Sequence, residues 1–264
     1  MTATTLVEEY RPGTVVLTKR VFTSEEEVQG QSATATREDV YRTLVEQVDP
    51  RGRPLSGMRV YDRAWFVLDV PTGRQEKNSA VAGQRVWFRP GATPTLDDAQ
   101  PLPADIASGL SLRPFDDVFL PGYPVWEGLT WEPPAESLER LNRFLRSIGL
   151  APDQQRIRVT WSATRSVEVV GSADRHRSAV LDIEWTASGL MATPTGRTAT
   201  RVQMRGSLLL DLDDKLITAV NLSGARPDAN ATFRIVLTRE LIARTGEIVL
   251  EPPVKDEGGG DGGK

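Results

Sequence analysis

The predicted strands of this chain are unusually long, and their length limits the folds that it can adopt. Residues 14–29 and 32–49 are rich in alternating β-branched residues, and Gly30 and Gln31 between them indicate a tight hairpin. Further strands are predicted at residues 59–70, 79–89, 156–171, 177–188, 198–212, 216–223, 232–238 and 247–250. A strand of fifteen residues is roughly 50 Å long, and a sheet of such strands must twist and curve.

One stretch of the chain, residues 133–149, follows the periodicity of a helix instead. Prolines in its first turn, glutamates near its start, arginines near its end and a final glycine are typical of helix boundaries. Its apolar residues recur at three- and four-residue spacing and form one stripe, which consists of Leu138, Leu141, Leu145 and Ile148. We therefore expect a mainly β fold: a large curved antiparallel sheet, or open half-barrel, of long strands with this amphipathic helix packed on it.

A proline-rich segment separates two groups of predicted strands. Nine of the eighteen prolines lie in residues 90–134, which predicts an extended crossing segment without a regular helix or a central strand. We expect residues 5–252 to form a single β-rich domain, with a division into two lobes at the proline-rich segment as the alternative. Glycine and charged residues dominate residues 253–264, which predicts a flexible tail.

The composition excludes several classes of site. The chain has no cysteine and a single histidine, so it cannot form a disulfide, a thiolate metal site or a multi-histidine metal site. We expect no metal and no cofactor. The net charge of −4 argues against nucleic acid as a partner.

The ends of the chain bear on its location. No window approaches the eighteen apolar residues of a transmembrane segment, and residues 1–6 lack the pattern of a signal peptide. Two alternatives remain open: the protein is extracytoplasmic, in the cell envelope, if a leader has been removed, and otherwise it is cytoplasmic.

The polar motifs predict no catalytic residue. His176 lies in the charged stretch 172–177, which we interpret as a turn, and we favour a surface histidine over a general base beside Asp174. Acidic residues at 211–214 lack the glycine and the distal glutamate of a calcium loop, so we interpret them as a hairpin turn.

An apolar set of residues is the first candidate binding site. Aromatic residues of the proline-rich segment and the helix stripe could line a cavity between helix and sheet, with ordinary core packing as the alternative. The residues are Trp126, Trp131, Leu138, Leu141, Phe144 and Leu145.

A local excess of arginine is the second candidate. Residues 140–177 carry a positive charge in an acidic protein, which suggests a patch for an anionic partner or a lipid head group. The alternative is that these are solvated faces of a helix and a sheet. The patch residues are Arg140, Arg143, Arg156 and Arg158.

Two short segments of the sequence resemble segments of bacterial envelope proteins. Residues 120–131 are LPGYPVWEGLTW, and residues 206–214 are GSLLLDLDD. With its long N-terminal strands, the chain resembles uncharacterised bacterial lipoprotein-type domains and is similar in architecture to the Lol-type and mycobacterial lipoprotein carriers. The resemblance implies a half-barrel that holds acyl chains, and it carries over no catalytic residue.

These observations lead to one main hypothesis and two alternatives. The first is a non-catalytic envelope module that binds a lipid-like or other hydrophobic ligand, such as an apolar small molecule. The second is a structural or assembly protein that forms subunit contacts through its sheet, and the third is a carboxylate-based hydrolase. The oligomeric state stays open.

Overall fold

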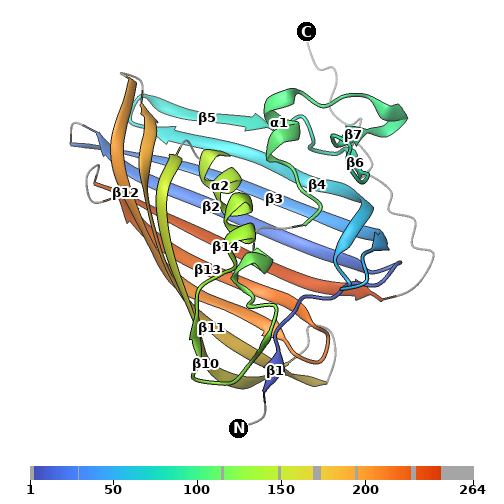
Figure 1. Ribbon diagram of the computed structural model, residues 1–264. Coiled ribbons are helices and arrows are strands. Elements are labelled where there is room, and N and C mark those ends of the chain that lie inside the picture. Colours follow the sequence, from blue (N-terminus) through green and yellow to red (C-terminus); the bar gives the residue numbers. More distant parts are fainter. Residues whose placement is uncertain are drawn as a thin grey trace.

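A single large sheet dominates the computed structural model of the protein (Figure 1). The structure describes residues 3–28, 30–113, 116–147, 150–168, 174–193, 196–226 and 230–244. In spatial order the strands are β7 (Thr95–Leu96), β6 (Arg85–Phe88), β4 (Pro54–Val70), β3 (Gln31–Val48), β2 (Val15–Val28), β14 (Ala231–Ala243), β13 (Leu216–Arg226), β12 (Gly196–Asp211), β11 (Arg175–Thr193), β10 (Leu150–Glu168) and β9 (Thr130–Trp131), with β5 (Gly73–Asn78) paired to β4. Neighbouring strands are antiparallel, and β7 and β9 at the two ends do not pair with each other, so the sheet stays open. The predicted fold class is confirmed.

Strand length follows from uninterrupted hairpin pairing. Strands β10 and β11 each run for 19 residues and pair along nearly their whole length. The predicted hairpin at Gly30 and the predicted turn at residues 213–215 are both present.

The predicted strand at residues 79–89 forms only in its second half, as β6. Residues 79–84 form a tight turn instead, in which the amide of Ala82 donates to the carbonyl of Ser79 and Gly83 takes a positive φ of 68°. Strand β5, which precedes this turn, was not predicted. The strand predicted at residues 247–250 and the tail at residues 253–264 lie outside the described residues.

The amphipathic helix forms as predicted. Helix α2 (Ala135–Ser147) lies across the sheet (Figure 1), and Leu141 and Leu145 of its stripe are fully buried. The predicted helix end at residues 148–149 lies outside the described residues. We call the sheet face that α2 covers the inner face.

The proline-rich segment contains more helix than predicted. It forms the short helix α1 (Ala104–Gly109), the 3-10 turns η1 (Asp97–Ala99) and η2 (Asp116–Phe119), and strand β8 (Pro124–Val125), which pairs with β1 (Thr4–Thr5). Pro103 precedes α1 at a position where proline is compatible with a helix start, so the prolines limit the length of the helix without preventing it.

Two apolar clusters lie on the inner face. The main cluster joins α2 and η2 to strands β10–β14, and it includes Trp161, Leu181, Trp185, Leu208 and Leu237. The second joins residues of the proline-rich segment to β3, β4 and β6, and it includes Tyr41, Tyr61, Phe88, Leu102 and Leu112. Because β2 pairs with β14, strands from both ends of the chain share one sheet. The domain bounds at residues 5 and 252 stay a prediction.

No helix among the described residues is both long and apolar enough to cross a bilayer.

Candidate ligand-binding face

The structure brings three of the predicted apolar site residues together under α2. Trp131, Leu141 and Leu145 belong to the main cluster and are buried. The indole nitrogen of Trp131 donates to the carbonyl oxygen of Phe119 at 2.9 Å, which joins η2 to β9. These side chains fill the space between helix and sheet.

The other predicted apolar residues lie elsewhere. Trp126 is 45% exposed, so the structure separates it from Trp131. Leu138 is half-buried at the edge of the main cluster. The side chain of Phe144 lies outside the described part of the structure.

An open hollow of about 500 Å³ lies beside α2, where strand β10 begins. This volume is in the range of ligand pockets. Its walls are mostly polar and consist of Leu138, Asn142, Pro152, Asp153, Gln154 and Gln155. Hydrogen bonds run from it into the core: Gln155 donates to Asn142 of α2 and accepts from the indole of Trp185 at 3.2 Å.

The three described side chains of the predicted arginine patch do not lie on one face of the sheet. Arg140 lies on α2, on the inner side of the sheet, and pairs with Asp117 of η2. Arg156 and Arg158 are exposed and alternate along β10 with the buried Ile157 and Val159 of the main cluster, so they point away from α2. The side chain of Arg143 lies outside the described part of the structure.

A band of charged side chains crosses the inner face between the two apolar clusters. This charged band consists of Glu8, Arg20, Asp39, Arg59 and Arg239. Cross-strand register places it on the inner face, because Arg20 lies opposite Leu237 on one side and opposite Asp39 on the other. Alternation along the chain did not predict the band, since both faces of residues 39–45 mix apolar and polar side chains.

Each of the two carboxylates in the charged band pairs with arginine. Arg239 Nη1 donates to Glu8 Oε1 at 2.7 Å, and both side chains are almost completely buried. Asp39 accepts hydrogen bonds from Arg20 and Arg37. Burial raises the pKa of Asp39, but the charges of Arg20 and Arg37 outweigh it, so the pKa lies below its ordinary value and the carboxylate stays ionised.

Arg59 is different, because its partners among the described residues are neutral. It is only 6% exposed, and its Nε donates to Thr43 Oγ1 at 3.2 Å. Its two Nη atoms donate to the Tyr61 hydroxyl at 3.2 Å and to the carbonyl of Ser111 at 3.1 Å. The guanidinium lies 4.2, 5.8 and 5.0 Å from the ring centres of Tyr41, Tyr61 and Phe88. Burial raises the pKa of Tyr61, so its hydroxyl keeps its proton and supplies no negative charge.

A small cavity of about 20 Å³ adjoins Arg59 and Arg239. It has room for a single water molecule. Four residues with hydroxyl groups line it, namely Tyr10, Thr18, Tyr41 and Thr43, and Leu112 of the proline-rich segment lies in its wall. The site therefore combines two arginines and hydroxyl groups with apolar side chains.

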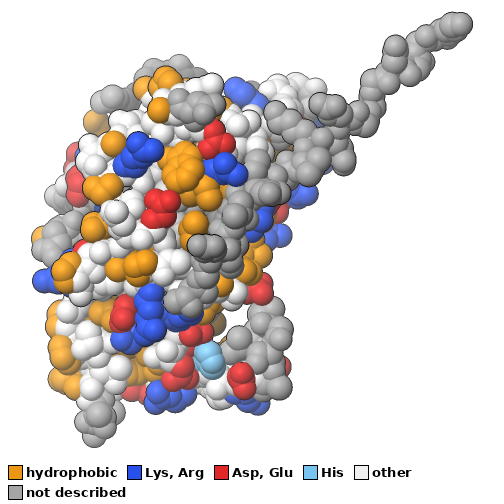
Figure 2. Space-filling model, turned by 90° about the vertical axis from the view of Figure 1, so that its right-hand side faces the viewer, with side chains coloured by type: hydrophobic (Ala, Val, Ile, Leu, Met, Phe, Trp, Pro, Cys, Tyr) orange, Lys and Arg blue, Asp and Glu red, His pale blue; other side chains and the backbone are white. Residues whose placement is uncertain are grey.

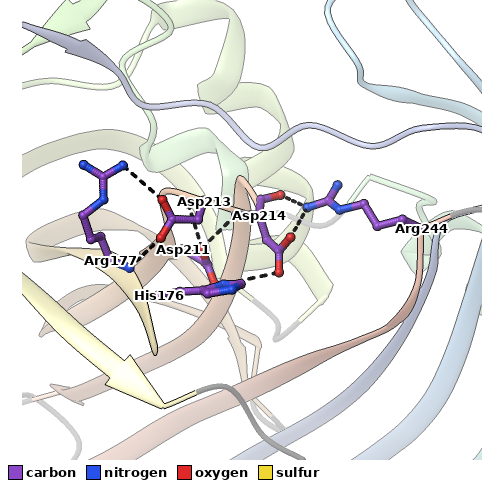
Figure 3. A network of polar contacts seen from close by, with 6 residues as sticks. All are labelled: His176, Arg177, Asp211, Asp213, Asp214 and Arg244. Carbon is purple, nitrogen blue, oxygen red and sulfur yellow. Dashed lines mark hydrogen bonds and ion pairs between the residues drawn. The ribbon is translucent and has the colours of Figure 1, made fainter. Parts of the chain in front are cut away.

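His176 belongs to a separate network at the ends of three strands. The predicted turn is wrong here: His176 lies in β11 and pairs with Val167 of β10, because the long hairpin continues to residues 168 and 175. Its Nδ1 lies 2.8 Å from Asp211 Oδ2 and 3.5 Å from Asp214 Oδ2, so its carboxylate partners are Asp211 and Asp214 (Figure 3). The histidine reaches the surface among acidic side chains (Figure 2).

The same network could offer ligands to a metal ion. Side-chain atoms of His176, Asp211 and Asp213 lie within 4.8 Å of one another. These atoms already have partners, since Asp211 Oδ1 accepts from two amides of the turn and Asp213 accepts from Arg177. The network therefore holds the ends of these strands together.

Comparisons with known proteins concern the fold. No family model and no curated protein matches the chain. It is similar to lipovitellin at 8% identity with a TM-score of 0.33, over 92% of this chain and 26% of the lipovitellin chain, so it spans about a quarter of that protein. It is similar to a candidate outer membrane lipoprotein-sorting protein domain from Vibrio parahaemolyticus at 10% identity with a TM-score of 0.30, over 90% of this chain and 89% of the other. It is also similar to a candidate exported protein with a YmcC-like fold from Bacteroides fragilis at 9% identity with a TM-score of 0.25, over 91% of this chain and the whole of the other.

A domain described as lipoprotein-sorting is thus among the proteins to which the chain is similar. All three TM-scores are below 0.5, and all three identities are 10% or lower. The functional argument therefore rests on the residues of this chain.

Proposed function

We propose that this protein is a non-catalytic binding module of the bacterial cell envelope that holds a lipid-like or other hydrophobic ligand against the inner face of its sheet. The observation that supports the proposal is the way the inner face is covered. A long apolar surface formed by strands β10–β14 lies under one 13-residue helix and a segment of irregular structure, although the sheet itself continues well beyond them (Figure 1). The envelope location rests on the resemblance of residues 120–131 and 206–214.

The apolar space under α2 is filled in this conformation, so the ligand has to replace part of the cover. Helix α2 is attached at its edges by polar contacts, from Arg140 to Asp117 and from Asn142 to Gln155. The hydrogen bond between Asn142 and Gln155 can be exchanged for hydrogen bonds to water at little net cost, whereas the Arg140–Asp117 pair is mostly buried and costs more to open. In the proposed binding step an apolar chain enters at the hollow beside β10 and takes the place of Leu141 and Leu145.

A tethering experiment tests this step. The uncharged dye N-phenyl-1-naphthylamine should bind the wild-type protein with a rise in fluorescence. The N142C/Q155C variant has the only two cysteines of the chain, and a short cleavable bis-maleimide should join α2 to β10 through them. The dye signal should fall when the tether forms and return when it is cleaved.

The two single-cysteine variants, treated with the same reagent, are the matched controls. They should bind the dye as the wild type does. If the wild-type protein fails to bind the dye, or if the tethered protein binds it equally well, the proposed function is wrong.

A further inference from the structure

The charged band carries more positive than negative charge. Its three arginines face two carboxylates, and both carboxylates are already engaged by Arg239 and by Arg20 with Arg37. Among the described residues, the hydrogen-bond acceptors of Arg59 are all neutral. Arg59 is nevertheless only 6% exposed. A buried cation without a counter-ion is unfavourable, so this position favours an anion.

The partners of Arg59 are arranged in a way that an anion can use. The guanidinium is a planar fork that matches carboxylate and phosphate oxygens, and one of its Nη atoms is now occupied by the carbonyl of Ser111. Ser111 belongs to the proline-rich segment that covers the inner face, whereas Thr43 and Tyr61 belong to the sheet. Movement of residues 110–112 would therefore expose Arg59 and leave the sheet contacts in place.

The hydrogen bond from Arg59 to the Ser111 carbonyl is already charge-assisted through the guanidinium. Exchange of this neutral acceptor for a carboxylate or phosphate adds the attraction between opposite charges and permits two parallel N–H···O bonds. The cavity beside Arg59 also adjoins Arg239 and residues that carry hydroxyl donors, namely Thr18, Tyr41 and Thr43. These groups can satisfy the remaining lone pairs of a carboxylate or phosphate.

We propose that Arg59 binds the anionic head group, a carboxylate or a phosphate monoester, of an amphiphile whose apolar chain lies on the inner face. The head group displaces the Ser111 carbonyl, and the chain runs from the charged band toward the main cluster under α2, where Leu237 lies directly beside Arg20. This inference rests on the proposed function and adds the chemical class of the ligand.

The test is displacement of bound N-phenyl-1-naphthylamine by four probes. Laurate, dodecyl phosphate and dodecanol have the same apolar chain and differ in the head group, while inorganic phosphate has no chain. Laurate or dodecyl phosphate should displace the dye at a concentration about tenfold or more below that of dodecanol. Inorganic phosphate alone should not displace it.

Variants locate the effect. The R59Q variant should lose the preference for the acidic probes and keep its affinity for dodecanol. The matched control is R63M, which removes a charge from the same strand at a side chain that is 60% exposed and interacts with Glu38. It should keep the preference.

The outcomes separate the two proposals. Equal displacement by laurate, dodecyl phosphate and dodecanol overturns the role of Arg59 while the proposed function stands. If inorganic phosphate displaces the dye as effectively as dodecyl phosphate does, the inference that the ligand is an amphiphile is overturned. Failure of the dye to bind overturns the proposed function itself. The wild-type comparison needs no variant, so the test remains decisive if R59Q does not fold.

Discussion

At the scale of single residues, the network around His176 makes stability depend on pH. The hydrogen bond to Asp211 and the charges of Asp211, Asp214 and Asp213 raise the pKa of His176 above its ordinary value, against a smaller effect of burial. Arg177 and Arg244 also belong to the network, where they pair with Asp213 and Asp214 (Figure 3). A pKa that is raised in the folded state stabilises the fold through the protonated form.

Because the pKa of His176 is raised in the folded state, we expect the stability of the protein to depend on pH. The contribution of His176 is complete below its unfolded pKa of about 6.5 and is lost as pH rises through the raised value. The free energy of unfolding of wild type relative to H176Q should therefore be larger at pH 6 than at pH 9, by about 1 kcal/mol because the site is partly exposed. Urea unfolding at the two pH values measures the difference.

The lowered pKa of Asp213 does not interfere with this measurement. Its hydrogen bonds from Arg177 lower the pKa of Asp213, so its contribution is lost only as pH falls through the acid range. If the free energy of unfolding of wild type exceeded that of H176Q by the same amount at pH 6 and at pH 9, the role of protonated His176 would be contradicted.

At the scale of elements, helix α2 is both a core element and a cover. Leu141 is fully buried in the main cluster, and its truncation to alanine should lower the free energy of unfolding by about 2–5 kcal/mol. If a ligand chain takes the place of this side chain, L141A should also bind N-phenyl-1-naphthylamine more tightly than wild type, because the ligand then displaces less apolar contact.

The matched substitution on the same helix is E139A. The Glu139 side chain is 59% exposed, forms an ion pair with the exposed Arg146 and accepts a long hydrogen bond of 3.5 Å from Asn142, so the change should be within about 0.5 kcal/mol. Dye affinity of L141A equal to that of wild type would mean that α2 is a fixed part of the core.

At the scale of the whole molecule, one sheet joins β2, near the start of the chain, to β14, the last described strand. Strand β2 pairs with β14 from Val15 with Ala243 to Glu26 with Ala231, across more than two hundred positions of sequence. Separation of these strands would expose the backbone of both halves at once. The structure therefore predicts a single unfolding transition for the molecule, in contrast to the alternative of two lobes.

Urea unfolding with two probes tests this prediction. Far-UV circular dichroism reports on the whole sheet, and the fluorescence of a W65F/W87F variant reports on tryptophans 126–185 alone. The two midpoints should coincide. Two separate transitions would favour independent lobes on either side of the proline-rich segment.

Local signals along the chain were sufficient for much of this architecture. The β-branched runs, the hairpin at Gly30 and the turn at residues 213–215 depend on neighbouring residues, and the structure has them where the sequence predicts them. The helix also follows from local periodicity, since Leu141 and Leu145 recur on one face. Errors occurred where a local pattern was ambiguous, as at residues 79–84, where a turn takes the place of the first half of a predicted strand.

The candidate site depended on contacts that no local pattern contains. Arg59 meets Ser111 across 52 positions, and Glu8 meets Arg239 across 231. A register shift between Val40 and Tyr41 helps to decide which side chains of β3 and β4 share the inner face. Local patterns were therefore enough for most of the long strands, for helix α2 and for the exclusion of thiolate and multi-histidine metal sites. The positions of the charges followed from tertiary contacts, because the burial of an ionised side chain depends on partners that distant strands and the covering segment bring to it.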